Sequence, residues 1–525
     1  MTTQDSPDTE FYMKAKELFF LFLLVLGLSN TPPLQGAAAN PKVYPEKPNI
    51  LFVITDDQSW LHSSAYGSEW IQTPNMDRLA KGGVRFENAY VSSPSCAPSR
   101  AGILTGRNVW QLREGAVLWG RFPKEFPTYV ERLEGHNYKN GYVGKGWGPG
   151  ENFTQDNPAG EDYNRTRRDA PESFFTRDYS SDFIAFLSER TEGQPFLFWF
   201  GAHEPHRRFK EGAGYANRYK PEDVVVPPFL PDTEAVRAEL ADYALEIEYF
   251  DQQLGRMIEH LEWIGELENT LIVVTSDNGM PYPRAKTTCY EYGTRVPLIA
   301  HWPAQIPGDR VVTDFVSLID LMPTFLDVAG EVIPGTVTGR SLMPILRSEE
   351  EGRINDDWNW VVTGVERHAT WPAAAERALR VDDFLYVRHD QPEIPRTRLN
   401  TPIWRIVDAM APTHPLYPFY EKRRGNMPRE ELFNVVEDPA CMHDLANDPA
   451  YEAIKEELSV RLDEILRRQN DPRAFGYGDI FNVYPDFRKW SYSGYHWEYI
   501  DPAWPILNNN DWRRFGVPET YFDVN

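Results

Sequence analysis

Cysteine is scarce in this sequence of 525 residues, and only Cys96, Cys289 and Cys441 are present. An odd number leaves at least one thiol outside any disulfide bond, which excludes a disulfide framework as the basis of the fold. A bond between Cys289 and Cys441 stays open, because sequence alone does not decide a pairing. Apolar residues make up 41% and charged residues 25%, as in ordinary globular proteins, so an apolar core must hold the structure together.

Basic residues are also fewer than acidic residues. The chain has 54 Lys and Arg against 78 Asp and Glu, which gives a formal net charge of -24. Proteins that bind nucleic acid present a face rich in Lys and Arg, so this balance excludes nucleic acid as a partner. An acidic surface suits a soluble exported protein, and one local basic pocket is still enough to bind an anionic substrate.

Long apolar runs are missing after the first forty residues. The one near the N-terminus, at 18–28, is shorter than the roughly 20 residues that cross a bilayer. Two lysines precede this run and three alanines follow at 37–39, a pattern typical of a signal peptide with its cleavage site. We therefore expect a signal peptide over 1–39, with an acidic extension before a second possible start at Met13, and an exported protein that is periplasmic or secreted. No membrane association is expected after signal removal; a retained N-terminal anchor is the alternative.

Three continuous apolar runs predict buried strands, at 49–55, 195–201 and 270–276. Runs of this kind, rich in β-branched residues, are typical of parallel strands that are covered on both faces. Apolar residues recur at helical spacing over 233–267. Strands that alternate with helices predict an α/β fold with a mostly parallel sheet between helices.

The pattern changes near residue 357. Shorter strands with alternating polarity follow, as at 384–388, then a helix over 451–468 and an aromatic-rich tail. The chain is also too long for one compact core. We expect a first domain over 40–356 and a smaller α+β domain with the aromatic-rich tail over 357–525.

Oxygen-bearing side chains end two of the predicted strands. Asp56 and Asp57 follow the first run, and Asp277 and Asn278 follow the last. Sites in open α/β sheets form beyond the carboxyl ends of the strands, where three carboxylates would repel one another without a cation. Such ligands favour calcium or magnesium over zinc. A helix cap and a plain turn are the alternative interpretations.

Cys96 lies in a second notable segment, which runs from Cys96-Ala-Pro98-Ser-Arg100 to Leu104-Thr-Gly-Arg107. Pro98 suits the first turn of a helix, so Cys96 should lie at or just before a helix N-terminus. That position stabilises an anion and lowers a thiol pKa. Cys96 is therefore a candidate nucleophile, with a small buried apolar residue as the alternative.

The pattern Cys-x-Pro-Ser-Arg followed by Leu-Thr-Gly-Arg resembles the signature of the formylglycine-dependent sulfatases. In that family a maturation enzyme oxidises the cysteine to an aldehyde. The hydrate of the aldehyde attacks sulfur, and the sulfated hemiacetal then expels sulfate. The resemblance implies an alkaline-phosphatase-like core with a smaller C-terminal domain, and a sulfated carbohydrate as substrate.

The resemblance extends over most of the chain and assigns roles to individual residues. It implies one Ca²⁺ ion that is held by Asp56, Asp57, Asp277 and Asn278, with residue 96 facing the same ion. It implies catalytic roles, in binding sulfate, stabilising charge or protonating the leaving group, for Cys96, Arg100, Lys145, His206 and Lys286.

One position departs from the family pattern. Many sulfatases carry a histidine two residues after the lysine that matches Lys145, whereas this chain has Trp147. This shifts proton transfer onto His206 or Lys286. Trp147 is expected either to stack on a sugar ring or to form a pocket wall, and His203 and Arg207 to support substrate binding.

The segments at 203–207, 224–233 and 276–283 resemble the sulfamidase (heparan N-sulfatase) branch, which also includes bacterial enzymes that act on O-sulfated polysaccharides. The branch leaves open whether an N–S or an O–S bond is cleaved, so a sulfamidase acting on N-sulfated glucosamine stays an alternative. A formylglycine-dependent phosphoester or phosphonate hydrolase is a second alternative. A non-catalytic binder of sulfated glycans, with Cys96 never oxidised, is a third.

Overall fold

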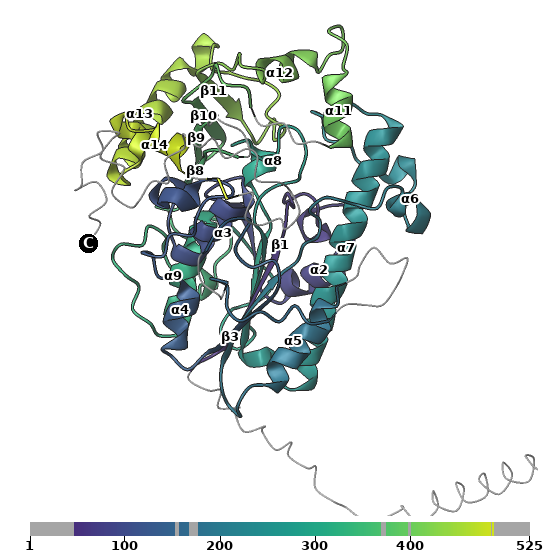
Figure 1. Ribbon diagram of the computed structural model, residues 1–525, viewed down its shortest axis with the longest axis vertical. Coiled ribbons are helices and arrows are strands. Elements are labelled where there is room, and N and C mark those ends of the chain that lie inside the picture. The colour runs from purple at the N-terminus through teal and green to yellow at the C-terminus, as the bar shows by residue number, and fades with distance from the viewer. Residues whose placement is uncertain are drawn as a thin grey trace, which may run out of the picture. The chain divides into compact units, whose positions relative to one another are not determined.

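A computed structural model describes residues 47–152, 157–166, 177–368, 374–396, 401–484 and 486–487 (Figure 1). By its internal contacts the chain divides into two units, Met1–Tyr44 and Pro45–Asn525. The expected signal peptide and most of the aromatic-rich tail lie outside the described residues. Among those that are described, no helix combines the length and the apolar character needed to cross a membrane.

A seven-stranded sheet forms the centre of the second unit, in the order β3-β4-β1-β5-β6-β2-β7. Neighbouring strands are parallel except at β6, which runs antiparallel to both β5 and β2. The expected mostly parallel sheet is thus confirmed. Its strands are β1 (Asn49–Thr55), β2 (Val84–Tyr90), β3 (Lys139–Gly144), β4 (Phe196–Gly201), β5 (Thr270–Ser276), β6 (Leu298–His301) and β7 (Arg310–Ser317).

Helices cover both faces of this sheet, because successive residues of β1 point into different apolar clusters. Ile50 and Phe52 pack in one cluster, with α3 (Cys96–Thr105), α4 (Tyr129–Glu134) and α9 (Leu321–Val328). Leu51 and Val53 pack in the other, with α2 (Pro74–Lys81), α5 (Tyr179–Ser188) and α7 (Glu234–Trp263). The long helix α7 ends four residues before the predicted bound, at a turn that leads into β5.

A second, antiparallel sheet follows in the order β11-β10-β9-β8. Leu379, Tyr386 and Leu432 of this sheet belong to the same apolar cluster as Ile50 of β1, so the two sheets share one core. The strands are β8 (Trp360–Val365), β9 (Glu376–Val381), β10 (Phe384–His389) and β11 (Glu430–Asn434), and α13 (Glu452–Arg468) packs on them. The short helices are α6 (Ala213–Asn217), α8 (Glu291–Thr294), α10 (Met343–Leu346), α11 (Pro402–Asp408), α12 (Tyr417–Lys422) and α14 (Ile480–Val483).

All three cysteines are buried free thiols. Cys289 and Cys441 lie in the same small apolar cluster but form no bond with each other. The pairing that the sequence left open is therefore not made in this structure.

Candidate active site

The site begins where β1 and β5 end side by side. These strands are parallel neighbours in register from Asn49↔Thr270 to Thr55↔Ser276, so the residues after them meet. The Asp57 backbone N–H donates to Asp277 Oδ1 at 3.1 Å, and Asn278 Nδ2 donates to Asp57 Oδ1 at 2.7 Å. Asp56 and its three neighbours in this group are at most 1% exposed. The four oxygen-bearing side chains that the sequence pointed to thus form one buried group.

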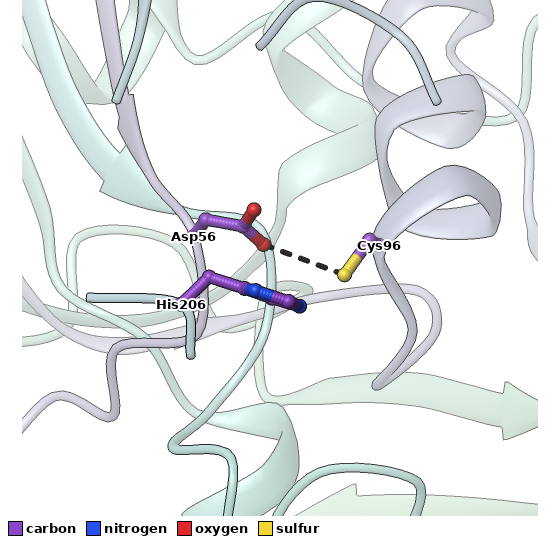
Figure 2. A group of neighbouring side chains, drawn as sticks. All are labelled: Asp56, Cys96 and His206. Carbon is purple, nitrogen blue, oxygen red and sulfur yellow. Dashed lines mark hydrogen bonds between the residues drawn. The ribbon is translucent and has the colours of Figure 1, made fainter. Parts of the chain in front are cut away.

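Cys96 faces this group from the first residue of α3, as Pro98 predicted. Its Sγ lies 3.4 Å from Asp56 Oδ1 and 3.8 Å from Asp57 Oδ1. Figure 2 shows the thiol directed at Asp56, with the His206 ring beside both. Burial, and then the charge of Asp56, raise the pKa of the Cys96 thiol, so the helix N-terminus does not produce a thiolate here as the sequence suggested.

Three basic side chains balance the three carboxylates. Lys145 Nζ lies 2.6 Å from Asp56 Oδ2, and Lys286 Nζ lies 2.5 Å from Asp57 Oδ1 and 3.1 Å from Cys96 Sγ. Burial alone would raise the pKa of Asp56, but the positive charges around it, first of all that of Lys145, hold it well below its usual range. Asp56 is therefore ionised at neutral pH.

Arg100 supplies the third positive charge from within the protein. Its Nε donates to Asp277 Oδ2 at 2.7 Å, and its Nη1 donates to the carbonyl oxygens of Lys145 and Gly146 at 2.7 and 3.0 Å. The side chain is fully buried and is absent from the cavity lining. Its contacts suit it to positioning Asp277 and the loop after β3.

His206 presents one ring nitrogen to the site. Nδ1 donates to the Arg207 carbonyl oxygen at 2.6 Å, which leaves Nε2 facing Asp57 Oδ2 at 3.8 Å. The side chain is 43% exposed, yet the protein around it lowers its pKa below the usual 6.5. His203 is more enclosed, and burial lowers its pKa to about 3, so its ring is neutral.

Several of these groups form the floor of a cavity of about 1100 Å³. Of the residues that the sequence singled out, the lining contains Asp56, Asp57, Cys96, Lys145, His203, His206, Arg207 and Lys286. Several other lining residues were not predicted from the sequence, among them Trp119, Arg208, His368 and Arg405. Arg208 directly follows the predicted segment 203–207 and could have been included with it. Arg405 carries no local signal, because it comes from α11, far along the chain.

Trp147 lies behind the cavity wall and is absent from the lining. Its Nε1 donates to the Ala97 carbonyl oxygen at 3.1 Å, and its ring packs edge-on against Phe122. In this position it supports the first turn of α3. Trp119, by contrast, lines the cavity.

The buried group fits a hard divalent cation. Oxygen or sulfur atoms of Asp56, Asp57, Cys96 and Asp277 all lie within 4.8 Å of one another. Asn278 Oδ1 is buried and has no hydrogen-bond partner among the described residues, so one more oxygen is available as a ligand. Burial and the neighbouring Asp56 charge raise the pKa of Asp277, as expected where carboxylates crowd together.

A family model described as Sulfatase matches residues 48–331, more than half of the chain. The chain belongs to the sulfatase family. It is therefore a sulfuric ester hydrolase, and the family predicted from the Cys96 segment is confirmed.

Similar proteins agree with this membership. An ulvan-active sulfatase of Formosa agariphila is 27% identical to this sulfatase over 515 residues, which is 91% of this chain and 83% of the relative. Human N-sulphoglucosamine sulphohydrolase is 28% identical over 507 residues, covering 86% and 93%. BT4656, solved in complex with its substrate D-glucosamine-2-N,6-O-disulfate, superposes with a TM-score of 0.61 at 22% identity, covering 81% and 98%, and shows the shared fold.

Proposed function

We propose that this sulfatase removes sulfate from a sulfated carbohydrate, with residue 96 as formylglycine and one Ca²⁺ ion at its side. The observation that carries the proposal is the position of Cys96, which lies among three carboxylates and beside Lys286 on a cavity floor. A cavity of about 1100 Å³ has room for a sugar. The sulfated carbohydrates named for the relatives support this substrate class.

The calcium ligands in this proposal are Asp56, Asp57, Asp277 and Asn278. When bound, Ca²⁺ would act as a Lewis acid that withdraws charge from the oxygens of the sulfate group. The three carboxylates are already balanced by Arg100, Lys145 and Lys286. A divalent cation therefore makes the floor of the cavity net positive, which favours an anionic ester.

Each catalytic residue has a task that its position allows. Residue 96, once oxidised and hydrated, supplies the oxygen that attacks sulfur. Lys145 and Lys286 bind the sulfate oxygens, since both amino groups reach the cavity floor. His206 donates a proton through Nε2 to the leaving oxygen or nitrogen, and Arg100 keeps Asp277 in place.

The domain and location assignments belong to the same proposal. Residues 40–356 supply the catalytic groups, and 357–525 add part of the cavity wall, including His368 and Arg405. A signal peptide over 1–39 would direct the chain to the periplasm or the medium. A formylglycine-generating enzyme would then be a required partner during production.

Sulfate release tests the proposal directly. Protein made together with a maturation enzyme and supplied with Ca²⁺ should release sulfate from N-sulfated heparin disaccharides, from O-sulfated ulvan oligosaccharides, or from both. The substrate that is cleaved decides between a sulfamidase and an O-sulfatase. Mass spectrometry of the peptide that contains residue 96 should show loss of the thiol sulfur. An intact thiol in fully active protein would refute the formylglycine mechanism.

Cys96→Ala should reduce sulfate release to the rate in buffer, because it removes the atom from which the nucleophile is made. The substitution is small and should leave the melting temperature close to that of the wild type. Cys289→Ala is the matched control, since Cys289 is equally buried but outside the cavity lining, and it should stay active. Wild-type activity in Cys96→Ala would overturn the assignment.

A further inference from the structure

Three arginines line the same cavity as the proposed sulfate-binding residues. They are Arg207, Arg208 and Arg405. Arg207 pairs with Glu239 of α7. Burial lowers the pKa of Arg207, and the positive charges of Arg405 and Arg208 lower it further against the opposing effect of Tyr282.

Arg405 is held in place by the helix that carries it. α11 buries Ile403, Trp404 and Val407 in the apolar cluster that also contains the face of α7. The two helices are in contact, and Figure 1 shows α11 beside the end of α7. This packing leaves the side chain of Arg405 exposed on the cavity side of α11. The guanidinium is thus presented by a fixed scaffold.

The acidic groups on the same wall form no ion pair with Arg208 or Arg405 among the residues that the structure describes. Glu239 is occupied by Arg207, and Asp242 accepts hydrogen bonds from the backbone N–H groups of Gly212 and Gly214 at 2.9 and 2.7 Å. Within the part of the chain that the structure describes, neither Arg208 nor Arg405 has a side-chain hydrogen bond or an ion pair. Two exposed guanidinium groups therefore face the cavity without a protein anion.

We propose that Arg208 and Arg405 form a second anion-binding subsite, which binds a further anionic substituent of the same carbohydrate while its sulfate ester lies on the floor. The proposal rests on the proposed function and narrows it to carbohydrates that carry at least two negative groups. The second group is a carboxylate or a second sulfate, because guanidinium binds both through paired hydrogen bonds.

A simpler interpretation is that both arginines are solvated surface charges. Like charges are costly to hold together, and here three arginines converge on one cavity in a protein with a net charge of -24. Glu211 is exposed on the same lining, but it has not paired with either free arginine. The arrangement is the one expected for a bound anion.

Three sulfated disaccharides test the subsite. The first is neutral apart from one sulfate, the second adds a uronic acid carboxylate, and the third adds a second sulfate. In the double variant Arg208→Gln/Arg405→Gln, kcat/KM for at least one doubly anionic substrate should fall about 10- to 100-fold through a higher KM, the range for loss of charged hydrogen bonds. The value for the singly charged substrate should stay within about twofold. The doubly anionic substrate for which kcat/KM falls shows whether the second anion is the carboxylate or the sulfate.

Arg256→Gln is the matched control. Arg256 is an exposed arginine on α7, about 20 Å along the helix from Asp242, so replacing it removes one positive charge far from the cavity, against the two removed by the double variant. It should affect all three substrates equally and little. Equal losses for singly and doubly charged substrates in the double variant, or no loss for any, would overturn the subsite.

Binding to catalytically inert protein separates this inference from the proposed function. Calorimetry with Cys96→Ala should show weaker binding of a doubly anionic disaccharide when both arginines are replaced, whether or not the wild type turns it over. If the wild type releases no sulfate but this difference in binding persists, the proposed reaction fails and the subsite stands. If the difference is absent, the subsite fails.

Discussion

At the scale of single residues, His206 is the group whose protonation state matters most. Its Nδ1–H is committed to the Arg207 carbonyl, so only Nε2 is available to a substrate. Because its pKa lies below 6.5, the ring is mostly neutral at pH 7. A neutral ring with a bare Nε2 cannot donate a proton from that atom, and the imidazolium form must do so.

We therefore expect kcat/KM of the wild type to fall as the pH rises through a value below about 6.5. His206→Gln should remove this limb of the profile and reduce the rate by about 10²–10⁴-fold, the usual contribution of a general acid. Sulfate release measured between about pH 4.5 and 8.5 gives both results. If His206→Gln kept the pH profile of the wild type, Lys286 would be assigned as the proton donor instead.

At the scale of elements, hydrogen bonds in both directions connect the loop after β3 with the start of α3. The Trp147 indole donates to Ala97 of α3, and Arg100 of α3 donates back to the carbonyls of Lys145 and Gly146. These bonds fix residue 96 relative to the lysine that would bind sulfate. Trp147, which stands where many sulfatases carry a histidine, therefore lies where it can stabilise the contact between this loop and α3.

Trp147→Phe should lower the free energy of unfolding by about 0.5–1.5 kcal/mol, because it removes one buried hydrogen bond and keeps an aromatic ring. KM for the carbohydrate should not change, whereas Trp119→Ala should raise it by removing a ring from the cavity wall. Denaturant unfolding and steady-state kinetics on the two variants make the comparison. A raised KM in Trp147→Phe with unchanged stability would support sugar stacking by Trp147 instead.

At the scale of the whole molecule, the proposed calcium ligands lie at the centre of the fold, after two strands that are paired along their full length. A ligand that binds only the native state stabilises it, by about 2.7 kcal/mol when its free concentration is a hundred times Kd. Binding of Ca²⁺ at this one site should therefore stabilise the entire domain against unfolding.

Thorough chelation should lower the melting temperature by a few degrees and abolish sulfate release, and Ca²⁺ should restore both. The physical reason is that the cation binds the native arrangement of Asp56, Asp57 and Asp277 and not the unfolded chain, so its removal takes this binding free energy away from the native state. Differential scanning calorimetry with and without chelator gives the measurement, with Asp277→Asn as a variant that should respond less. Unchanged melting and unchanged activity after chelation would contradict the calcium site.

Much of this arrangement could be predicted from the sequence because its signals are local. Continuous apolar runs predicted β1, β4 and β5, and the parallel sheet then required the residues after β1 and β5 to meet. The position of Arg405 could not be predicted, since packing of a seven-residue helix on α7 brings it to the cavity. Nor could sequence spacing decide that Trp147 points behind the wall, or that burial outweighs the helix N-terminus at Cys96.

The burial of Cys96 limits the time at which residue 96 can be modified. Every residue of α3 is buried, and Cys96 is 2% exposed. A second protein therefore cannot bind this segment once the domain has folded. The proposed oxidation of residue 96 would therefore have to come before folding is complete. At a synthesis rate of about 5–20 residues per second, α11 emerges roughly 15–60 s after Cys96. That interval is the natural period in which a maturation enzyme can meet an open chain, and production conditions that hasten folding should yield more protein with an unconverted cysteine.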